Sequence, residues 1–226
     1  GLATDGSFSA GETTFAIEST EPTGPTKIDG KAATAALAFG MNDQRISYSG
    51  SATGVTTTVS SPDIPFPQLN LGYTEAAFNF LMPVGPTEEP ADFAFLTRLV
   101  DLSVSDEIWG MIDPTNQLPR DPATLVIDTK GTATITADIT DPAAMEAMAT
   151  PPGEVNTFDI TELHAKVAGA ELTGAGAFTF DNTDMVTFGG FPAPTGKLDL
   201  KLTGGNGLLD KLVAMGMFAE DEAMGF

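Results

Sequence analysis

The chain reads Lys197-Leu198-Asp199-Leu200-Lys201-Leu202 in its last third, with charged and apolar residues alternating at every position. The stretch Thr132-Ala133-Thr134-Ile135-Thr136-Ala137-Asp138-Ile139 alternates in the same way. Successive side chains of a β-strand point to opposite faces, so this pattern is typical of a strand with one face in a core and one in water. Sheets of such strands are usually antiparallel. The two stretches therefore predict an antiparallel β-protein.

Helical spacing replaces the alternation in two parts of the chain. Phe93, Leu96 and Leu99 recur at three-residue intervals, and a second helix is expected over Ser105–Met111, with Ser105 or Asp106 near its N-cap. A further helix is expected over 207–218. We therefore expect a mainly β fold with minor α, of the α+β class, in which one or two curved antiparallel sheets carry helices near 91–111 and 207–218.

Two five-residue segments raise the question of an internal repeat. Leu96–Val100 and Leu209–Val213 share the pattern Leu-polar-basic-Leu-Val and are separated by half the chain. A strand–helix module used twice explains the pattern, and so does chance, because short helical patterns are common. The chain is then either two β-sheet halves, 1–122 with helices near 91–111 and 123–226 with a helix near 207–218, or one continuous domain.

The charge of the chain excludes one class of partner. Thirty-one Asp and Glu residues outnumber 10 Lys and Arg, which gives a net charge of -21. Nucleic-acid binding needs a basic surface, so we expect no nucleic-acid partner. The sequence also has no cysteine and no apolar run long enough to span a bilayer as a helix. Disulfides, zinc–thiolate sites and a transmembrane segment in this chain are therefore not expected.

The sequence shows no catalytic constellation. Alternation places Glu162, His164 and Lys166 on one strand face, where the single histidine is expected to face solvent rather than do acid–base work. No nucleophile elbow or phosphate-binding loop accompanies it. We therefore expect a protein that is not an enzyme and has no cofactor. A buried carboxylate pair assembled from distant segments would reopen the question.

The stretch Asp181-Asn182-Thr183-Asp184 is rich in oxygen ligands. It lacks the glycine and the terminal glutamate of a calcium loop, and an Asx turn between two strands explains it equally well. No metal site is therefore assigned, and a calcium ion at Asp181–Asp184 stays an open alternative.

Aromatic side chains provide the remaining indication of function. The pairs Phe78/Phe80 and Phe178/Phe180 are two residues apart, so each pair lies on one face of its strand. Such stripes form a core, or they line an apolar groove between a sheet and its helices. The candidate groove residues are Phe78, Phe80, Trp109, Phe178 and Phe180.

A proline-rich segment follows the expected first helix, and it reads as a structural joint. Trp109, the only tryptophan, is expected to pack the helix end onto the sheet, and Pro114 and Pro122 stiffen the connection. Arg120 is expected to pair with Asp113 or Asp121.

The same segment carries a family resemblance. Trp109–Pro114 and Leu118–Ala123, together with Pro192–Leu198 and Gly204–Met217, resemble the DUF2125 family, uncharacterised proteins of alphaproteobacteria that generally carry an N-terminal signal or anchor. The resemblance implies a location in the cell envelope and a repeated β architecture. It supplies no activity and no catalytic residue.

Two functional hypotheses from different classes follow. The first is a non-enzymatic envelope protein whose sheet and helices enclose a lipid or another apolar ligand. The second is a scaffold or accessory subunit that binds another protein through its sheet edges or its acidic surface. The resemblance implies a periplasmic location, with the chain soluble or tethered by a segment absent from this sequence.

Overall fold

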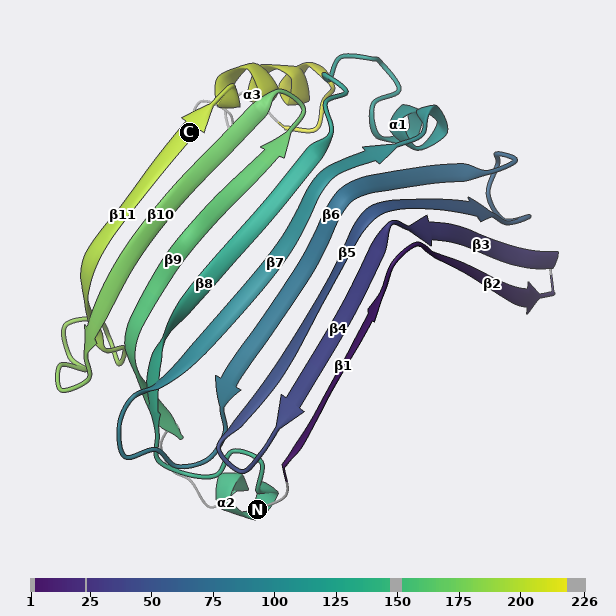
Figure 1. The fold of residues 1–226 in the computed structure, drawn as a ribbon. Helices are drawn as coiled ribbons and strands as arrows, with labels where there is room; N and C mark the ends of the chain where they lie inside the picture. The colour runs from purple at the N-terminus through teal and green to yellow at the C-terminus, as the bar shows by residue number, and fades with distance from the viewer. Residues whose placement is uncertain (1–2, 23, 147–151, 219–226) are drawn as a thin grey trace.

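The computed structural model describes residues 3–22, 24–146 and 152–218, and it shows one 11-stranded antiparallel sheet with short helices at its ends (Figure 1). The prediction of a mainly β fold with minor α is confirmed. The sheet is not strongly curled.

The elements follow one another along the chain with short connections. The strands are β1 (Thr4–Ala10), β2 (Thr13–Glu21), β3 (Gly24–Ala32), β4 (Thr34–Met41), β5 (Arg45–Ser60), β6 (Leu69–Pro83), β7 (Ala91–Val104), β8 (Ala123–Ile135), β9 (Gly153–Val167), β10 (Ala170–Asp181) and β11 (Ala193–Thr203). The helices are α1 (Asp106–Ile112), α2 (Pro142–Glu146) and α3 (Gly205–Ala214).

Nine strands form the main sheet in the order β1-β4-β5-β6-β7-β8-β9-β10-β11. The β2–β3 hairpin lies off this path, because β3 pairs with the second half of β5. The hairpin and the end of β5 project sideways from the main sheet (Figure 1). Gly54 has a φ of 57°, a left-handed conformation that glycine adopts without steric cost, in the middle of β5. The dipeptide Thr53-Gly54 between two alternating stretches would also suit a hairpin turn, but Arg45–Ser60 is a single long strand.

The predicted helix over the first part of 91–111 is also wrong. Residues Ala91–Val104 form β7, which pairs with β6 on one side and β8 on the other. Phe93, Leu96 and Leu99 fit a helical period, whereas Phe93, Phe95 and Leu99 fit a two-residue period, and pairing on both sides decided between the two. The second part of the prediction is confirmed by α1, and the C-terminal helix by α3. The N-cap of α3 is Gly204, and α3 ends at Ala214, short of the predicted end at Phe218.

The two segments that share a sequence pattern belong to different elements. Leu96–Val100 lies in β7, whereas Leu209–Val213 lies in α3. The shared pattern therefore does not mark two copies of one strand–helix module. The sheet is also continuous past residue 122, because β7 pairs with β8.

The described residues have a small buried core at one end of the sheet. Phe93, Ala133 and Ile135 are buried there, with Ile139 and Phe158 packed against them. The loops after β6 and β8 cover this end, since Ile139 donates its N–H to Val84 O at 3.0 Å. Elsewhere the sheet is a single layer, so most side chains on either face remain in contact with solvent.

Candidate functional site

Strand register places uncharged side chains in rows that cross the main sheet. Residues directly opposite each other on antiparallel strands point to the same face. One row of such partners contains Phe8, Leu37, Gly50, Phe78, Thr97, Ile127, Leu163, Gly174 and Leu200. This row runs through all nine strands without a charged residue.

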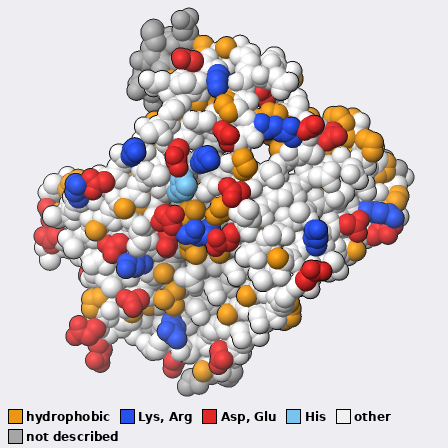
Figure 2. Space-filling model, turned by 45° about the horizontal axis from the view of Figure 1, so that its top comes forward, with side chains coloured by type: hydrophobic (Ala, Val, Ile, Leu, Met, Phe, Trp, Pro, Cys, Tyr) orange, Lys and Arg blue, Asp and Glu red, His pale blue; other side chains and the backbone are white. Residues whose placement is uncertain are grey.

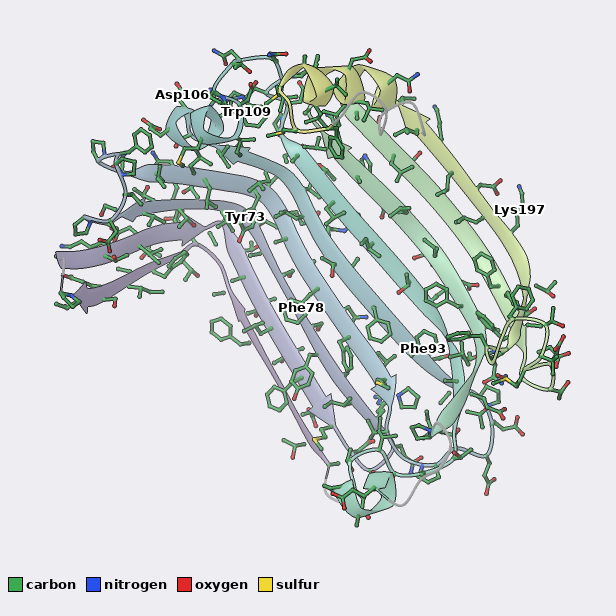
Figure 3. All side chains as sticks on the ribbon, turned by 180° about the vertical axis from the view of Figure 1, so that it is seen from behind. Tyr73, Phe78, Phe93, Asp106, Trp109 and Lys197 are labelled. Carbon is green, nitrogen blue, oxygen red and sulfur yellow. The ribbon has the colours of Figure 1, made fainter. Side chains whose placement is uncertain are left out.

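The rows on either side have the same character. Two residues along the strands lie Gly6, Phe39, Tyr48, Phe80, Phe95, Thr129, Ile160, Gly176 and Leu198. In the other direction lie Ala10, Ala35, Ala52, Ala76, Leu99, Leu125, Ala165, Leu172 and Leu202. We call the side of the main sheet that carries these rows the apolar face. Its side chains point toward the viewer around Phe78 and Phe93 in Figure 3.

Away from the buried end that carries Phe93 and Ile135, many large side chains on this face are not covered. Phe8 is 58% exposed, Leu37 56%, Phe78 46% and Leu202 62%. The whole chain has 13979 Å² of accessible surface, whereas a compact monomer of 23.4 kDa is expected to expose about 9,700 Å². A contiguous apolar surface of more than a few hundred Å² normally marks an interaction site. The apolar face is therefore the candidate functional site.

Aromatic rings connect the two predicted phenylalanine pairs across the face. Phe80 and Phe95 meet edge to face with ring centroids 5.2 Å apart, and Phe93 stacks on Phe158 at 6.4 Å. Phe158 lies directly opposite Phe178 on the neighbouring strand. Each pair lies on one face of its strand as predicted, and both pairs lie on the same face of the same sheet.

Glycines on this face leave room for aromatic rings of the neighbouring strands. A Cβ built on Gly6 would lie 2.6 Å from Cε1 of Phe39, and one on Gly131 would lie 2.5 Å from Cζ of Phe93. A larger residue at either position would displace the ring. The glycines thus allow each ring to lie down on the adjacent strand and shield its backbone from the solvent.

The opposite face carries the charges (Figure 2). Arg98 forms an ion pair with Glu162 at 2.7 Å and lies 3.9 Å from Glu75. His164 lies on this face and its Nε2 is 2.8 Å from Oε1 of Glu171, so its partner is not the Glu162 of its own strand. Among the described residues, no three His, Asp or Glu side chains lie close enough to hold a metal ion.

The segment after α1 is organised around a buried carboxylate. Asp113 is 2% exposed, and it accepts the Leu118 N–H at 2.6 Å and the Thr115 hydroxyl at 3.2 Å. Burial raises the pKa of this carboxyl, but hydrogen bonds from the Leu118, Gln117 and Thr115 backbone and the Thr115 side chain outweigh it, so the pKa is lowered overall. The segment 113–118 is therefore a turn closed by its own aspartate.

Arg120 does not pair with Asp113 or Asp121, and that prediction is wrong. Its guanidinium forms an ion pair with Asp106 in the first turn of α1 and donates to Val104 O at 2.9 Å. The reason is that the turn closed by Asp113 brings Arg120 back to the start of the helix. Asp121, Pro114 and Pro122 are exposed.

Trp109 lies apart from the other groove candidates. It is half-buried on α1 at the end of the sheet, whereas Phe78 and Phe93 lie within the sheet (Figure 3). The rows of leucine and isoleucine that join the phenylalanines were missed at the sequence level. Strict alternation in β8 and β11 could have found them, but only the register shows that they share a face.

The turn between β10 and β11 uses both of its aspartates internally. Asp181 Oδ1 accepts the Thr183 N–H at 2.9 Å and its hydroxyl at 2.6 Å, and Asp184 engages Thr187 in the same way. These threonine hydrogen bonds lower the pKa of both carboxyls. This is the predicted Asx-turn chemistry.

The β2–β3 hairpin carries a separate open depression of about 620 Å³. Its lining is partly polar, with Asp29 and Lys31 on β3 and Thr56 and Thr58 on β5. It is set apart from the apolar face by the sideways projection of the hairpin (Figure 1).

No family model, curated protein or solved structure matches this chain. The likeness to the DUF2125 family therefore stays a prediction that rests on the quoted segments. Of the helices that the structure describes, none combines the length and the apolar composition needed to cross a membrane.

Proposed function

We propose that this protein binds a lipid, with the acyl chains lying along the apolar face. The observation that supports this most directly is the set of rows through nine strands in which every side chain is uncharged. A ligand that is itself uncharged along its length matches such a surface, since burying a charge against it would be costly.

The dimensions of the face suit an extended chain. The row from Phe8 to Leu200 crosses all nine strands of the main sheet, so its strand-to-strand steps of about 4.8 Å span roughly 38 Å. The rings of Phe78, Phe80 and Phe95 provide contact area in the middle. Covering apolar surface is worth about 25 cal/mol per Å², so contact over several hundred Å² supports specific binding.

An alternative is a scaffold that binds another protein. The outer edge of β11 pairs with no strand among the described residues, and Leu198, Leu200 and Leu202 along it are 43% to 62% exposed. A partner strand could add to this edge. The net charge of -21 would then favour a basic partner.

Native mass spectrometry of the purified full chain tests the first proposal. We expect co-purifying mass of lipid size, released by organic extraction. A clean apo mass together with salt-sensitive capture of a basic protein would favour the scaffold.

A matched pair of variants ties binding to the apolar face. Phe78→Asp and Asn79→Asp introduce the same charge at neighbouring positions of β6, on opposite faces of the sheet. We expect Phe78→Asp to weaken binding of a fluorescent fatty acid at least tenfold and Asn79→Asp to leave it unchanged. Circular dichroism confirms that both variants fold. Equal binding by the two variants would contradict the proposal.

We further propose a periplasmic location, soluble or tethered, for which the only support is the resemblance to envelope proteins.

A further inference from the structure

The connection between β10 and β11 exposes four large apolar side chains, two of which are the most accessible of the described chain. Val186 is 89% exposed, Phe191 74%, Phe188 49% and Met185 43%. The segment lies at the end of the sheet away from α3 (Figure 1). An isolated exposed apolar residue is ordinary, but four within seven positions form a patch.

The loop is ordered by its own hydrogen bonds. Gly190 donates its N–H to Met185 O at 2.8 Å, and Phe191 donates to Phe188 O at 3.3 Å. At its start, the Asp184 carboxylate accepts the N–H groups of Val186 and Thr187 at 3.1 and 3.0 Å. The loop therefore presents its apolar side chains from a fixed backbone.

These backbone hydrogen bonds would allow the loop to enter the apolar part of a lipid bilayer. In the apolar part of a bilayer, backbone groups must find partners within the protein. The N–H groups of Val186, Thr187, Gly189, Gly190 and Phe191 already have them. No charged residue occurs from Met185 to Gly196.

The loop is continuous with the apolar face. Phe180 lies directly opposite Pro194, the second residue of β11 after the loop. Asn182 donates to the carbonyl of Val155, a residue of β9 that is 39% exposed. An apolar surface thus leads from the loop tip to the rows of the sheet.

We propose that this loop docks the end of the sheet onto a lipid bilayer, with Val186, Phe188 and Phe191 inserted among the headgroups and upper acyl chains. Docking itself does not require the proposed function. The inference rests on that function only for the purpose of docking, which would be to let lipid pass between the bilayer and the apolar face. Asp181 and Asp184 at the base of the loop disfavour an anionic surface, so the partner is a zwitterionic bilayer. A protein partner could supply hydrogen bonds to unpaired amides of the loop, whereas a bilayer cannot, so the pairing of these amides within the loop favours the bilayer.

Co-flotation of the full chain with phosphatidylcholine vesicles tests the proposal. We expect the wild type to float and Phe191→Ser to lower the partition coefficient about tenfold. Ile17→Ser is the matched control, because Ile17 is 57% exposed on the β2–β3 hairpin, far from the loop. That variant should float like the wild type. No flotation of the wild type, or equal losses in both variants, would overturn the proposal.

A second readout locates the loop. Phe188→Trp should show a blue-shifted emission with vesicles, whereas Ile17→Trp should not, with Trp109 as the same background in both. Adding phosphatidylglycerol should weaken binding, and binding that required it would overturn the choice of a zwitterionic surface.

Fatty-acid binding without vesicles separates the two proposals. Phe191→Ser should keep the wild-type affinity for a soluble fatty acid while losing flotation. If the wild type floats through Phe191 but binds no fatty acid, the proposed function fails and membrane docking stands.

Discussion

Arg98 of β7 reaches across β8 to Glu162 of β9, with 2.7 Å between its Nη2 and the carboxylate Oε2. Val126, which lies on β8 opposite both Arg98 and His164, is only 1% exposed. The charged face of the sheet therefore contains a small packed centre under its ion pairs, whereas the apolar face has none over most of its area. This inversion of the usual arrangement leads to the predictions below.

Replacing Arg98 by Met should lower the free energy of unfolding by about 1 kcal/mol, because a partly buried ion pair that joins three strands is lost. The effect should shrink in high salt. Urea denaturation at low and high NaCl concentration measures both. Lys197→Met is the control, since its pair with Asp199 is exposed and should contribute nothing measurable. Identical unfolding midpoints for wild type and Arg98→Met would contradict the prediction.

Val126→Ala should destabilise the fold by about 2 kcal/mol, because it leaves a cavity at a buried position. Its neighbour Ile127 is 42% exposed on the apolar face, so Ile127→Ala should cost less than about 1 kcal/mol. Fatty-acid binding should respond in the reverse order, with Ile127→Ala weaker and Val126→Ala unchanged. Equal stability losses in the two variants would argue against an uncovered apolar face.

Asp113 should make stability depend on pH at the acidic end. Its folded-state pKa is lowered below the ordinary value of 3.8, so its contribution is fully present above 3.8 and is lost as the pH falls through the lower folded-state pKa. Asp113→Asn should therefore be less stable than the wild type at pH 7 and differ less from it in strong acid. Chemical denaturation at several pH values measures this, with exposed Asp121→Asn as the control. A constant difference at all pH values would refute the assignment.

Gly54→Ala should destabilise the protein by about 1–2 kcal/mol, because the φ of 57° is unfavourable for a residue with a Cβ. The new Cβ would also lie 3.1 Å from that of Ala33. Gly207→Ala, in α3 with open space around it, should instead stabilise the helix by about 0.5–1 kcal/mol. Thermal denaturation measures both effects: the Gly54→Ala midpoint should lie below that of the wild type and the Gly207→Ala midpoint above it. An unchanged midpoint for Gly54→Ala would contradict a role of this glycine in β5.

The proposed location is tested on the full-length gene product. A reporter that is active only in the periplasm, fused to its C-terminus, should be active. Activity of a cytoplasmic reporter alone would contradict the periplasmic location and the envelope setting of lipid binding.

Much of the fold could be predicted from local pattern. Alternation in Lys197–Leu202 and Thr132–Ile139 predicts antiparallel strands, and the first of these lies in β11 as expected. Ser105 stands at the N-cap position of α1 as predicted, but its hydroxyl accepts the Asn70 N–H at 3.3 Å and makes no capping hydrogen bond. The pairs Phe78/Phe80 and Phe178/Phe180 are placed on strand faces by a period of two, which needs no partner to be recognised.

The remainder depended on the tertiary structure, for physical reasons. Residues 91–104 satisfy both helical and strand periods, and hydrogen bonding to β6 and β8 decided between them. Arg120 pairs with Asp106 because the turn closed by Asp113 places Arg120 next to the first turn of α1. Most of all, alternation shows that each strand has an apolar side, but it contains no information on whether another layer covers that side. Only the assembled register reveals that these sides form one continuous surface, which is uncovered except at the end that carries Phe93 and Ile135.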